Sequence, residues 1–407
     1  MDPPELTREG PDYIASWPGV MFRFSRLHDS RDDLVSLLNI SLHGFPGRPD
    51  GELYEGKIVL TGSRSKSDAV KACKDRVGET DWYPLLEKAC RTVRQSVEEG
   101  DPAIRLTPKP PSEAPGYLIP PLLREGDHTI LYARGGTGKS LLGLASLLSL
   151  TTGVEHMGLP VLGEPGPGIY ADWEEPTEDI HRERLAMLCA GCDHEPPPIT
   201  YKHMGGPLYA TADALARLIA REGVRYLVND SVALACGADP EKADAATMYY
   251  RALLSTGIRS SLNLAHHAKH DTDGVFGSVF WENTMRSVWF AKAGDRDDDG
   301  TLNLALIHRK VNRGPLQKPF GLKVSFSPES ISIRWQDASR LQEFREHLRQ
   351  KDRVLASLRD GGGRMTRKDL QTDTSIPAHT LREVVRRLER AAMVAVKDDC
   401  VMLLMAE

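Results

Sequence analysis

The middle of the chain alternates between two patterns of hydrophobic and polar positions. Short apolar runs of strand length occur four times, at 128–133, 168–173, 225–230 and 260–267. Segments with the 3.6-residue apolar spacing of amphipathic helices lie between or after them, at 140–150, 177–190, 212–222 and 244–255. Strands that alternate with helices predict an α/β domain with a mainly parallel sheet and helices on both of its faces.

Two further apolar runs follow this alternating region. Residues 287–293 and 302–310 are separated by the polar segment GDRDDDG. Two strand-like runs around a short Gly- and Asp-rich turn predict a hairpin. We expect it to be added at the edge of the sheet.

Proline content and pattern changes predict the domain boundaries. Residues 107–121 contain six prolines in TPKPPSEAPGYLIPP, which is typical of a stiff, extended linker. A second boundary is expected near 336–340, between a strand-like run and a charged helix. The chain is therefore divided into a small α+β N-terminal module (1–106), the linker, a central domain (122–336) and a C-terminal domain (340–407).

Composition limits the class of protein. The 407 residues carry a formal net charge of −5, so a nucleic-acid contact would need a local basic patch. No apolar run approaches the roughly 18 residues of a membrane span, and the polar N-terminus is unlike a signal peptide. Six scattered cysteines favour reduced thiols and a cytoplasmic protein.

The segment ARGGTGKS, residues 133–140, follows the first apolar run and opens a helix pattern. It has the parts of a P-loop: a turn whose N–H groups surround phosphate, a Lys for the outer phosphates, and a hydroxyl for Mg²⁺. Ala133 stands where the motif has its first Gly, and a strand-ending position with negative φ accepts Ala. We expect ATP and Mg²⁺ to bind Arg134, Gly135, Gly136, Thr137, Gly138, Lys139 and Ser140.

Carboxylates at later strand ends supply the other groups that an ATPase needs. Asp230 ends the run RYLVND and is the candidate that supports the metal together with Ser140, partly through water. Asp172, Glu174 and Glu175 end the run before it, and one of them is the candidate base for the attacking water. Strand alternation predicts that Asp172 and Glu174 share one face of the sheet and that Glu175 lies on the other.

The order of motifs over roughly residues 117–335 resembles the RepA-type plasmid replicative helicases and related AAA-family ATPases, which have the RecA-like core shared with DnaB. The motifs are the P-loop, WEEP, VND, HHAKHD, GSVFWENTMRSVWF and RKVNRGP. The resemblance implies that Glu174 is the catalytic base, with Glu175 beside it. It also implies that His267, or alternatively His266, senses the γ-phosphate.

The same resemblance implies a ring, most often a hexamer, in which each subunit sends a Lys and an Arg into its neighbour's ATP site. Lys310 and Arg313 match those residues. Because RKVNRG follows a strand expected at the sheet edge, Arg313 is predicted to act in trans. An Arg supplied by a partner can raise the rate of phosphoryl transfer about 10³–10⁵-fold.

The C-terminal pattern has a helix, a Gly break, a short helix from Thr366, a longer helix near Pro377 and two strand-like runs. This order resembles a winged helix-turn-helix, with four arginines along the third helix as candidate DNA contacts. They are Arg382, Arg386, Arg387 and Arg390. A winged helix that docks a protein is the alternative.

The sequence thus predicts a Mg²⁺-dependent ATPase with a RecA-like P-loop core. Its expected role is that of a ring-forming DNA helicase in replication. The alternative is a regulatory or signalling ATPase whose winged helix binds a partner or an operator without unwinding DNA.

Overall fold

The computed structural model describes residues 2–30, 33–45, 47–78, 80–108, 116–195, 197–268, 274–296, 300–338, 341, 344 and 348–404. The chain folds into two compact units. One comprises 1–114, 208–224 and 251–258, and the other comprises 115–207, 225–250 and 259–407. Residues 109–115 of the linker predicted at 107–121 lie outside the described residues, which resume at 116.

The first unit contains an antiparallel sheet in the simple order β1-β2-β3-β4-β5. Its strands are β1 (Glu5–Glu9), β2 (Asp12–Trp17), β3 (Gly19–Ser30), β4 (Asp33–His43) and β5 (Gly51–Val59). Two helices follow, α1 (Ser63–Val77) and α2 (Trp82–Glu99), and their apolar faces share a core with the sheet. The sequence analysis predicts a small α+β module in this region, without the order of its strands.

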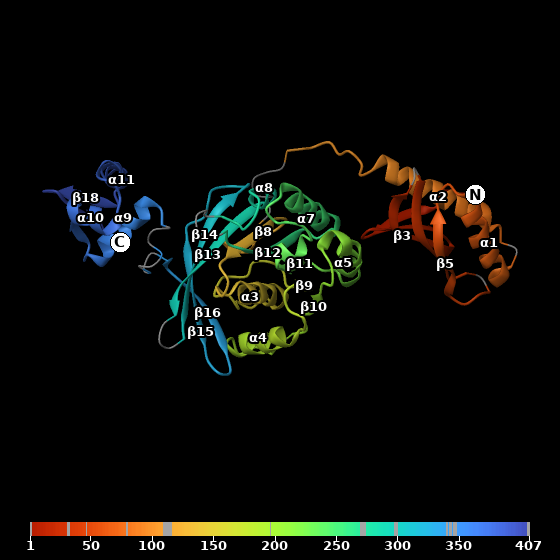
Figure 1. The fold of residues 1–407 in the computed structure, drawn as a ribbon, viewed down its shortest axis with the longest axis horizontal. Helices are drawn as coiled ribbons and strands as arrows, with labels where there is room; N and C mark the ends of the chain where they lie inside the picture. Colours follow the sequence, from red (N-terminus) through yellow and green to blue (C-terminus); the bar gives the residue numbers. More distant parts are fainter. Residues whose placement is uncertain are drawn as a thin grey trace. The chain divides into compact units, whose positions relative to one another are not determined.

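The second unit is built on a nine-stranded sheet in the order β10-β9-β11-β12-β8-β13-β14-β15-β16 (Figure 1). The first six strands run parallel and the last three continue the sheet antiparallel. The parallel strands are β8 (His128–Ala133), β9 (Gly168–Asp172), β10 (Thr200–His203), β11 (Tyr226–Asp230), β12 (Ser260–His266) and β13 (Ser287–Arg296). The antiparallel strands are β14 (Leu302–Val311), β15 (Phe320–Phe326) and β16 (Ile331–Gln336). The α/β fold with a mostly parallel sheet is as predicted.

The hairpin predicted from 287–293 and 302–310 is present as β13 and β14, but its predicted place at the sheet edge is wrong. β13 pairs in parallel with β8, and β14 pairs with β15. The hairpin therefore lies inside the sheet, and β16 is the edge strand on that side. The sequence pattern showed the hairpin but not that two more strands would cover it.

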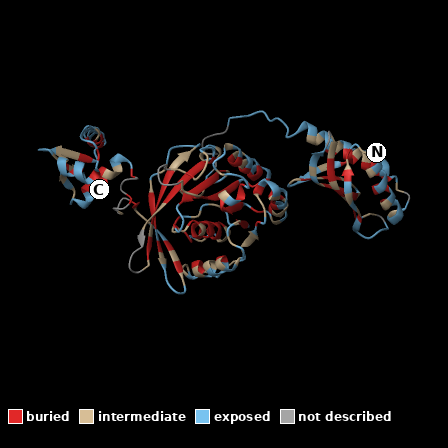
Figure 2. Ribbon diagram, viewed as in Figure 1, coloured by how far each residue is buried: buried red, intermediate tan, exposed pale blue. Residues whose placement is uncertain are grey.

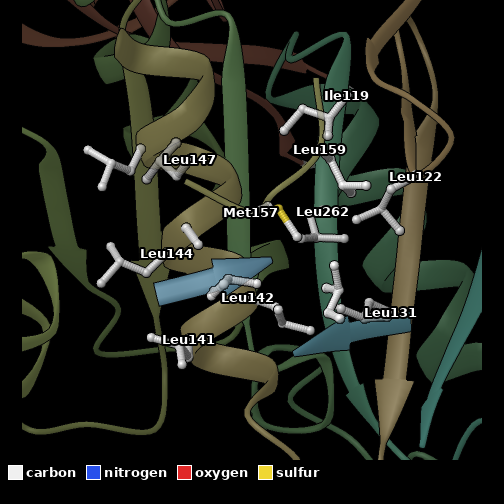
Figure 3. Packing of buried hydrophobic residues seen from close by; sticks show 14 of the residues in the cluster. Ile119, Leu122, Leu131, Leu141, Leu142, Leu144, Leu147, Met157, Leu159 and Leu262 are labelled. Carbon is white, nitrogen blue, oxygen red and sulfur yellow. The ribbon is translucent and has the colours of Figure 1, made fainter. Parts of the chain in front are cut away.

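One face of this sheet packs against α3 (Lys139–Thr152) and α4 (Asp179–Ala190). The α3 helix is apolar on most of its surface, and Leu142, Leu147 and Leu148 have no exposed area. Figure 2 shows this burial on α3 and on the central strands, and Figure 3 shows leucines of α3 beside residues of the sheet. A helix buried this completely fixes the position of its own N-terminus, where the P-loop lies.

Further elements lie between residues 117 and 284. The hairpin β6 (Tyr117–Ile119) and β7 (Leu123–Arg124) precedes β8. The remaining helices up to residue 284 are α5 (Leu208–Glu222), α6 (Val232–Ala235), α7 (Ala243–Ser255) and α8 (Phe280–Thr284). Among the described residues, none of the helices is both long and apolar enough to cross a membrane.

The C-terminal residues form three helices around a small core, with a three-stranded antiparallel sheet in the order β17-β19-β18. The helices are α9 (Gln350–Asp360), α10 (Arg367–Thr374) and α11 (Ala378–Arg390). The strands are β17 (Arg364–Thr366), β18 (Val394–Lys397) and β19 (Cys400–Leu403). Thr366 caps α10 by accepting a hydrogen bond from the Asp369 N–H. The strand β17 is absent from the sequence prediction.

Candidate functional site at the carboxyl edge of the sheet

The turn of residues 134–138 joins β8 to α3 and has the backbone of a phosphate-binding loop. Gly136 and Gly138 have φ values of +75° and +89°, a left-handed conformation that favours glycine. Ala133 ends β8 without a positive φ, as predicted. Helix α3 begins at Lys139, so its unpaired N–H groups and positive dipole end face this turn.

Lys139 is held within the turn. Its Nζ donates to the carbonyl oxygens of Ala133 at 3.3 Å and Arg134 at 3.2 Å. Burial lowers the pKa of Lys139, whereas the nearby carboxylates of Asp230 and Glu174 raise it. The ammonium group therefore lies in a buried position next to two carboxylates, where phosphate oxygens could replace its carbonyl partners.

Asp230 ends β11 beside the P-loop and is 3% exposed. Tyr170 Oη donates to its Oδ2 at 2.6 Å. Burial raises the pKa of Asp230, and hydrogen bonds from the Ser140 and Tyr170 hydroxyls oppose that rise. Ser140 and Asp230 therefore form a hydroxyl–carboxylate pair of the kind that holds Mg²⁺ with nucleotide phosphates. The donor set fits that metal, although no group of three or more His, Cys, Asp or Glu side chains in the described residues is arranged to hold an ion alone.

Glu174 and His266 face each other across the same site. Nε2 of His266 lies 3.2 Å from Oε1 of Glu174. The His266 side chain is 40% exposed and the Glu174 side chain is 35% exposed. The hydrogen bond from His266 is the main cause that lowers the pKa of Glu174, with smaller contributions from Ser231 and Lys139. Glu174 is therefore an ionised, partly accessible carboxylate, which is what a base for water requires.

Asp172 is a structural residue of this site. Its Oδ1 accepts from the N–H groups of Glu174 at 2.8 Å and Glu175 at 3.2 Å. His181 Nε2 lies 2.7 Å from its Oδ2. The predicted strand alternation does not apply here, because β9 ends at Asp172 and the next residues form a turn that donates two N–H groups to that carboxylate. With its oxygens engaged, Asp172 is poorly suited to act as the base.

The two candidate γ-phosphate sensors lie in different surroundings. His266 lines the P-loop cavity and contacts Glu174. The His267 ring instead lies 5.7 Å from the Tyr132 ring and 5.0 Å from the Phe290 ring, measured between centroids. The structure therefore favours His266, the alternative residue, over His267. The motif HHAKHD begins with two adjacent histidines that are both candidates for the sensor, and only their packing in the structure distinguishes them.

A cavity of about 360 Å³ lies between these groups. It is lined by Gly135, Gly136, Gly138, Lys139, Ser140, Leu141, Glu174, Arg184, His266, Leu302, Phe326 and Ile331. Sequence reasoning missed Arg184, which lies on α4. The available signal was a cation ten residues after Glu174, on the helix that follows the acidic segment.

Arg313 lies at the opposite end of the sheet. Ser287, the first residue of β13, pairs with both Thr129 near the start of β8 and Val311 at the end of β14. Arg313, two residues after the end of β14, therefore lies at the amino edge of the parallel strands, whereas the P-loop leaves from their carboxyl edge.

Charged groups surround Arg313 at this amino edge. Its Nη1 is 3.9 Å from Oδ1 of Asp127, whose side chain has no exposed area. Arg124 Nη1 donates to the Arg313 carbonyl at 2.6 Å. Burial raises the pKa of Asp127, and Arg313, Arg124 and Arg286 oppose that rise. The Arg313 guanidinium is still 49% exposed, so it is anchored but accessible.

Lys310 is already engaged within its own subunit. Its Nζ donates to the carbonyl oxygens of Glu282 at 2.6 Å, Asn283 at 3.1 Å and Met285 at 2.7 Å. These carbonyls belong to the end of α8 and the residues after it. Lys310 thus fixes α8 to β14 in this structure, which makes it a weaker candidate than Arg313 for reaching a neighbour.

The four arginines predicted to contact nucleic acid all lie exposed on α11. Arg382 alone of the four lines a groove of about 280 Å³, whose other lining residues are Arg367, Lys368, Gln371, Ala378, Leu381, Val385 and Asp399. The turn between β18 and β19 carries two acidic residues, Asp398 and Asp399. Helix α11 has four arginines and two glutamates, whereas α10 has two basic and two acidic residues, so positive charge is concentrated on α11.

Comparison with known proteins supports the nucleotide-binding assignment. Residues 95–273 match the family model of an AAA domain. A search of curated proteins finds no significant match. Among solved structures, one similar chain is a KaiC-like protein from the hyperthermophilic archaeon Pyrococcus horikoshii OT3, with 17% identity and a TM-score of 0.38, covering 57% of this chain and 99% of that one. The family match and the geometry of residues 133–140 together support a P-loop ATPase.

Proposed function

We propose that the protein is a Mg²⁺-dependent ATPase whose subunits form a ring, most simply a hexamer, and act on DNA. The observation that carries the ATPase part is that Lys139, Ser140 and Glu174 line one cavity at the carboxyl edge of the sheet, with buried Asp230 next to Ser140 and Lys139. Three separate strands deliver these groups, and a chance GKS sequence would not bring them together.

In this proposal each group has a distinct task. The N–H groups of residues 135–140 and the Lys139 ammonium neutralise the β- and γ-phosphates, which is the main requirement of phosphoryl transfer. Mg²⁺, when bound by Ser140 and Asp230, would offset negative charge on the same oxygens. Glu174 accepts the proton of the attacking water, and His266 holds that carboxylate in place. Arg184 adds a positive charge from α4.

The distance between Arg313 and its own P-loop supports action in trans. Because β14 lies inside the sheet, Arg313 does not follow an edge strand, and its distance from the P-loop is the stronger reason for that role. The six residues of β8 separate the two ends of the sheet by roughly 16–20 Å at about 3.3 Å per residue. An anchored Arg313 is too distant for its own phosphates and is free to meet those of a neighbouring subunit.

The C-terminal elements support a winged helix-turn-helix that binds duplex DNA. Their order, helix–strand–helix–helix–strand–strand, is that of a winged helix, and α11 presents Arg382, Arg386, Arg387 and Arg390 to solvent. One observation favours the alternative, a regulatory ATPase that docks a protein. Asp398 and Asp399 at the β18–β19 turn would repel phosphates there, so DNA contact would rest on α10 and α11 alone.

DNA-stimulated turnover separates the two functions. ATP hydrolysis is measured at one fixed salt concentration with no DNA, with single-stranded DNA and with duplex, for the wild type and for a variant with the four α11 arginines changed to alanine. We expect stimulation by DNA and weaker duplex binding by the variant, with unchanged basal turnover because α11 is not part of the P-loop cavity. A DNA-independent rate together with equal duplex affinity would select the regulatory ATPase.

A further inference from the structure

The P-loop cavity has an apolar part that none of the phosphate-binding groups explains. Leu302, Phe326 and Ile331 line it together with the P-loop, Glu174, His266 and Arg184. They come from the starts or ends of β14, β15 and β16, the antiparallel strands beyond the parallel sheet. Phosphate and metal need only polar groups, so this apolar lining is suited to another part of a ligand.

Strand register places the three side chains on one face. Phe326 pairs with Ile331, and Leu302 pairs with Val324, two residues before Phe326. Residues opposite each other, or two apart on a strand, point to the same side of a sheet. This is the face that packs on α3 and α4, because Leu302, Val324 and Ile331 all belong to the main core cluster.

Exposure changes along this face. Leu302 and Ile331 are each 4% exposed, whereas Phe326, the last residue of β15, is 37% exposed. The core thus ends in an accessible aromatic ring that lines the same cavity as the P-loop. An aromatic ring beside two buried aliphatic side chains forms a surface on which a flat, apolar ligand group could pack.

We propose that this surface, formed by Leu302, Phe326 and Ile331, binds the nucleobase of the triphosphate, with Phe326 as the main contact. The inference rests on the proposed ATP hydrolysis and deepens it. These three side chains carry no hydrogen-bond donor or acceptor, so they bury a base without reading its edge. The protein should therefore accept ATP and GTP with similar affinity.

The test measures dissociation constants of ATP, GTP and inorganic tripolyphosphate for the wild type, Phe326→Ala and Phe326→Trp. Base–aromatic contacts contribute enough that removing the ring should weaken ATP and GTP binding roughly tenfold. Tripolyphosphate binding should not change, because it has no base. Phe326→Trp should restore nucleotide affinity, since the ring is kept. Trp335→Ala is the matched control, as Trp335 is 55% exposed on β16 and does not line the cavity.

Three results would overturn this assignment. They are unchanged nucleotide affinity in Phe326→Ala, equal loss of ATP and tripolyphosphate, and a wild-type preference for one purine above tenfold. A different set of results would contradict the proposed ATPase function itself. In that case the wild type itself binds neither ATP nor tripolyphosphate, or Lys139→Ala binds both as well as the wild type does. A thermal melt of each variant shows whether the fold is kept.

Discussion

The two ends of the same parallel strands use charge in different ways. At the carboxyl edge, Glu174 and His266 are partly exposed around a cavity, and Lys139 lies beside two carboxylates. At the amino edge, Asp127 has no exposed area, and its oxygens have no hydrogen-bond partner in the structure, with three arginines around it. The first arrangement leaves room for a ligand, and the second fixes the segment that carries Arg313. Changes at the carboxyl edge should alter chemistry, and changes at the amino edge should alter subunit cooperation or stability.

The sharpest test of this comparison is Arg313→Ala. If Arg313 acts in a neighbour's ATP site, the variant should bind nucleotide but lose turnover by about 10³–10⁵-fold. This is the usual contribution of an arginine that a partner supplies in trans. Mixing it with Lys139→Ala protein should restore part of the activity, because some interfaces then pair an intact P-loop with an intact Arg313. A labelled-subunit assay must first show that subunits exchange.

Arg184→Ala is the matched control for this mixing experiment. Arg184 and Lys139 line the cavity of one subunit, so a mixture of Arg184→Ala with Lys139→Ala contains no complete site and should stay inactive. Rescue in both mixtures would mean that Arg184 also acts in trans. A protein that stays monomeric when saturated with ATP and DNA would remove the basis for action in trans.

A second prediction concerns the carboxyl edge alone. Glu174→Gln should lower turnover by roughly 10²–10⁴-fold, the usual contribution of a general base, while ATP still binds. Lys139→Ala should instead lose both binding and hydrolysis. Single-turnover hydrolysis and nucleotide binding, measured on the same samples, distinguish the two effects. Wild-type turnover in Glu174→Gln would move the search to Glu175, since Asp172 is occupied by His181 and two backbone N–H groups.

A third and smaller effect concerns the stability of the amino edge. His128, the first residue of β8, is 5% exposed, and burial lowers its pKa from 6.5 to about 4. The unfolded chain therefore binds a proton at a higher pH than the folded one, so stability falls as the pH drops from about 6.5 to 4. The full shift corresponds to up to about 3 kcal/mol.

Urea unfolding at several pH values between 7 and 4.5 tests this prediction. His128→Gln should show a shallower loss of stability than the wild type. His308, another buried histidine whose pKa is lowered to about 4, remains and keeps part of the slope. Trp335→Ala, which changes an exposed side chain on β16 and removes no titratable group, is the control and should leave the slope unchanged. Equal slopes for all three proteins would contradict the role given to His128.

The sequence by itself determined the alternation of strands and helices, the P-loop and the carboxylates at the strand ends. These features are local. A buried parallel strand needs a continuous apolar run, and a phosphate loop needs glycines at particular positions, such as Gly136 and Gly138. The same locality explains why the sequence pattern shows α10 from Thr366 and α11 near Pro377, after a Gly break.

Only the tertiary structure decided which side chains meet. The sequence did not indicate that β15 and β16 would extend the sheet beyond β14, because strand pairing depends on partners far along the chain. Because of these two strands, β14, which precedes Arg313, is not the edge strand of the sheet. They also bring Phe326 to the P-loop cavity. The preference for His266 over His267, the engagement of Lys310 by α8 and the burial of Asp127 depend in the same way on packing. A single sequence does not encode such contacts at any fixed spacing.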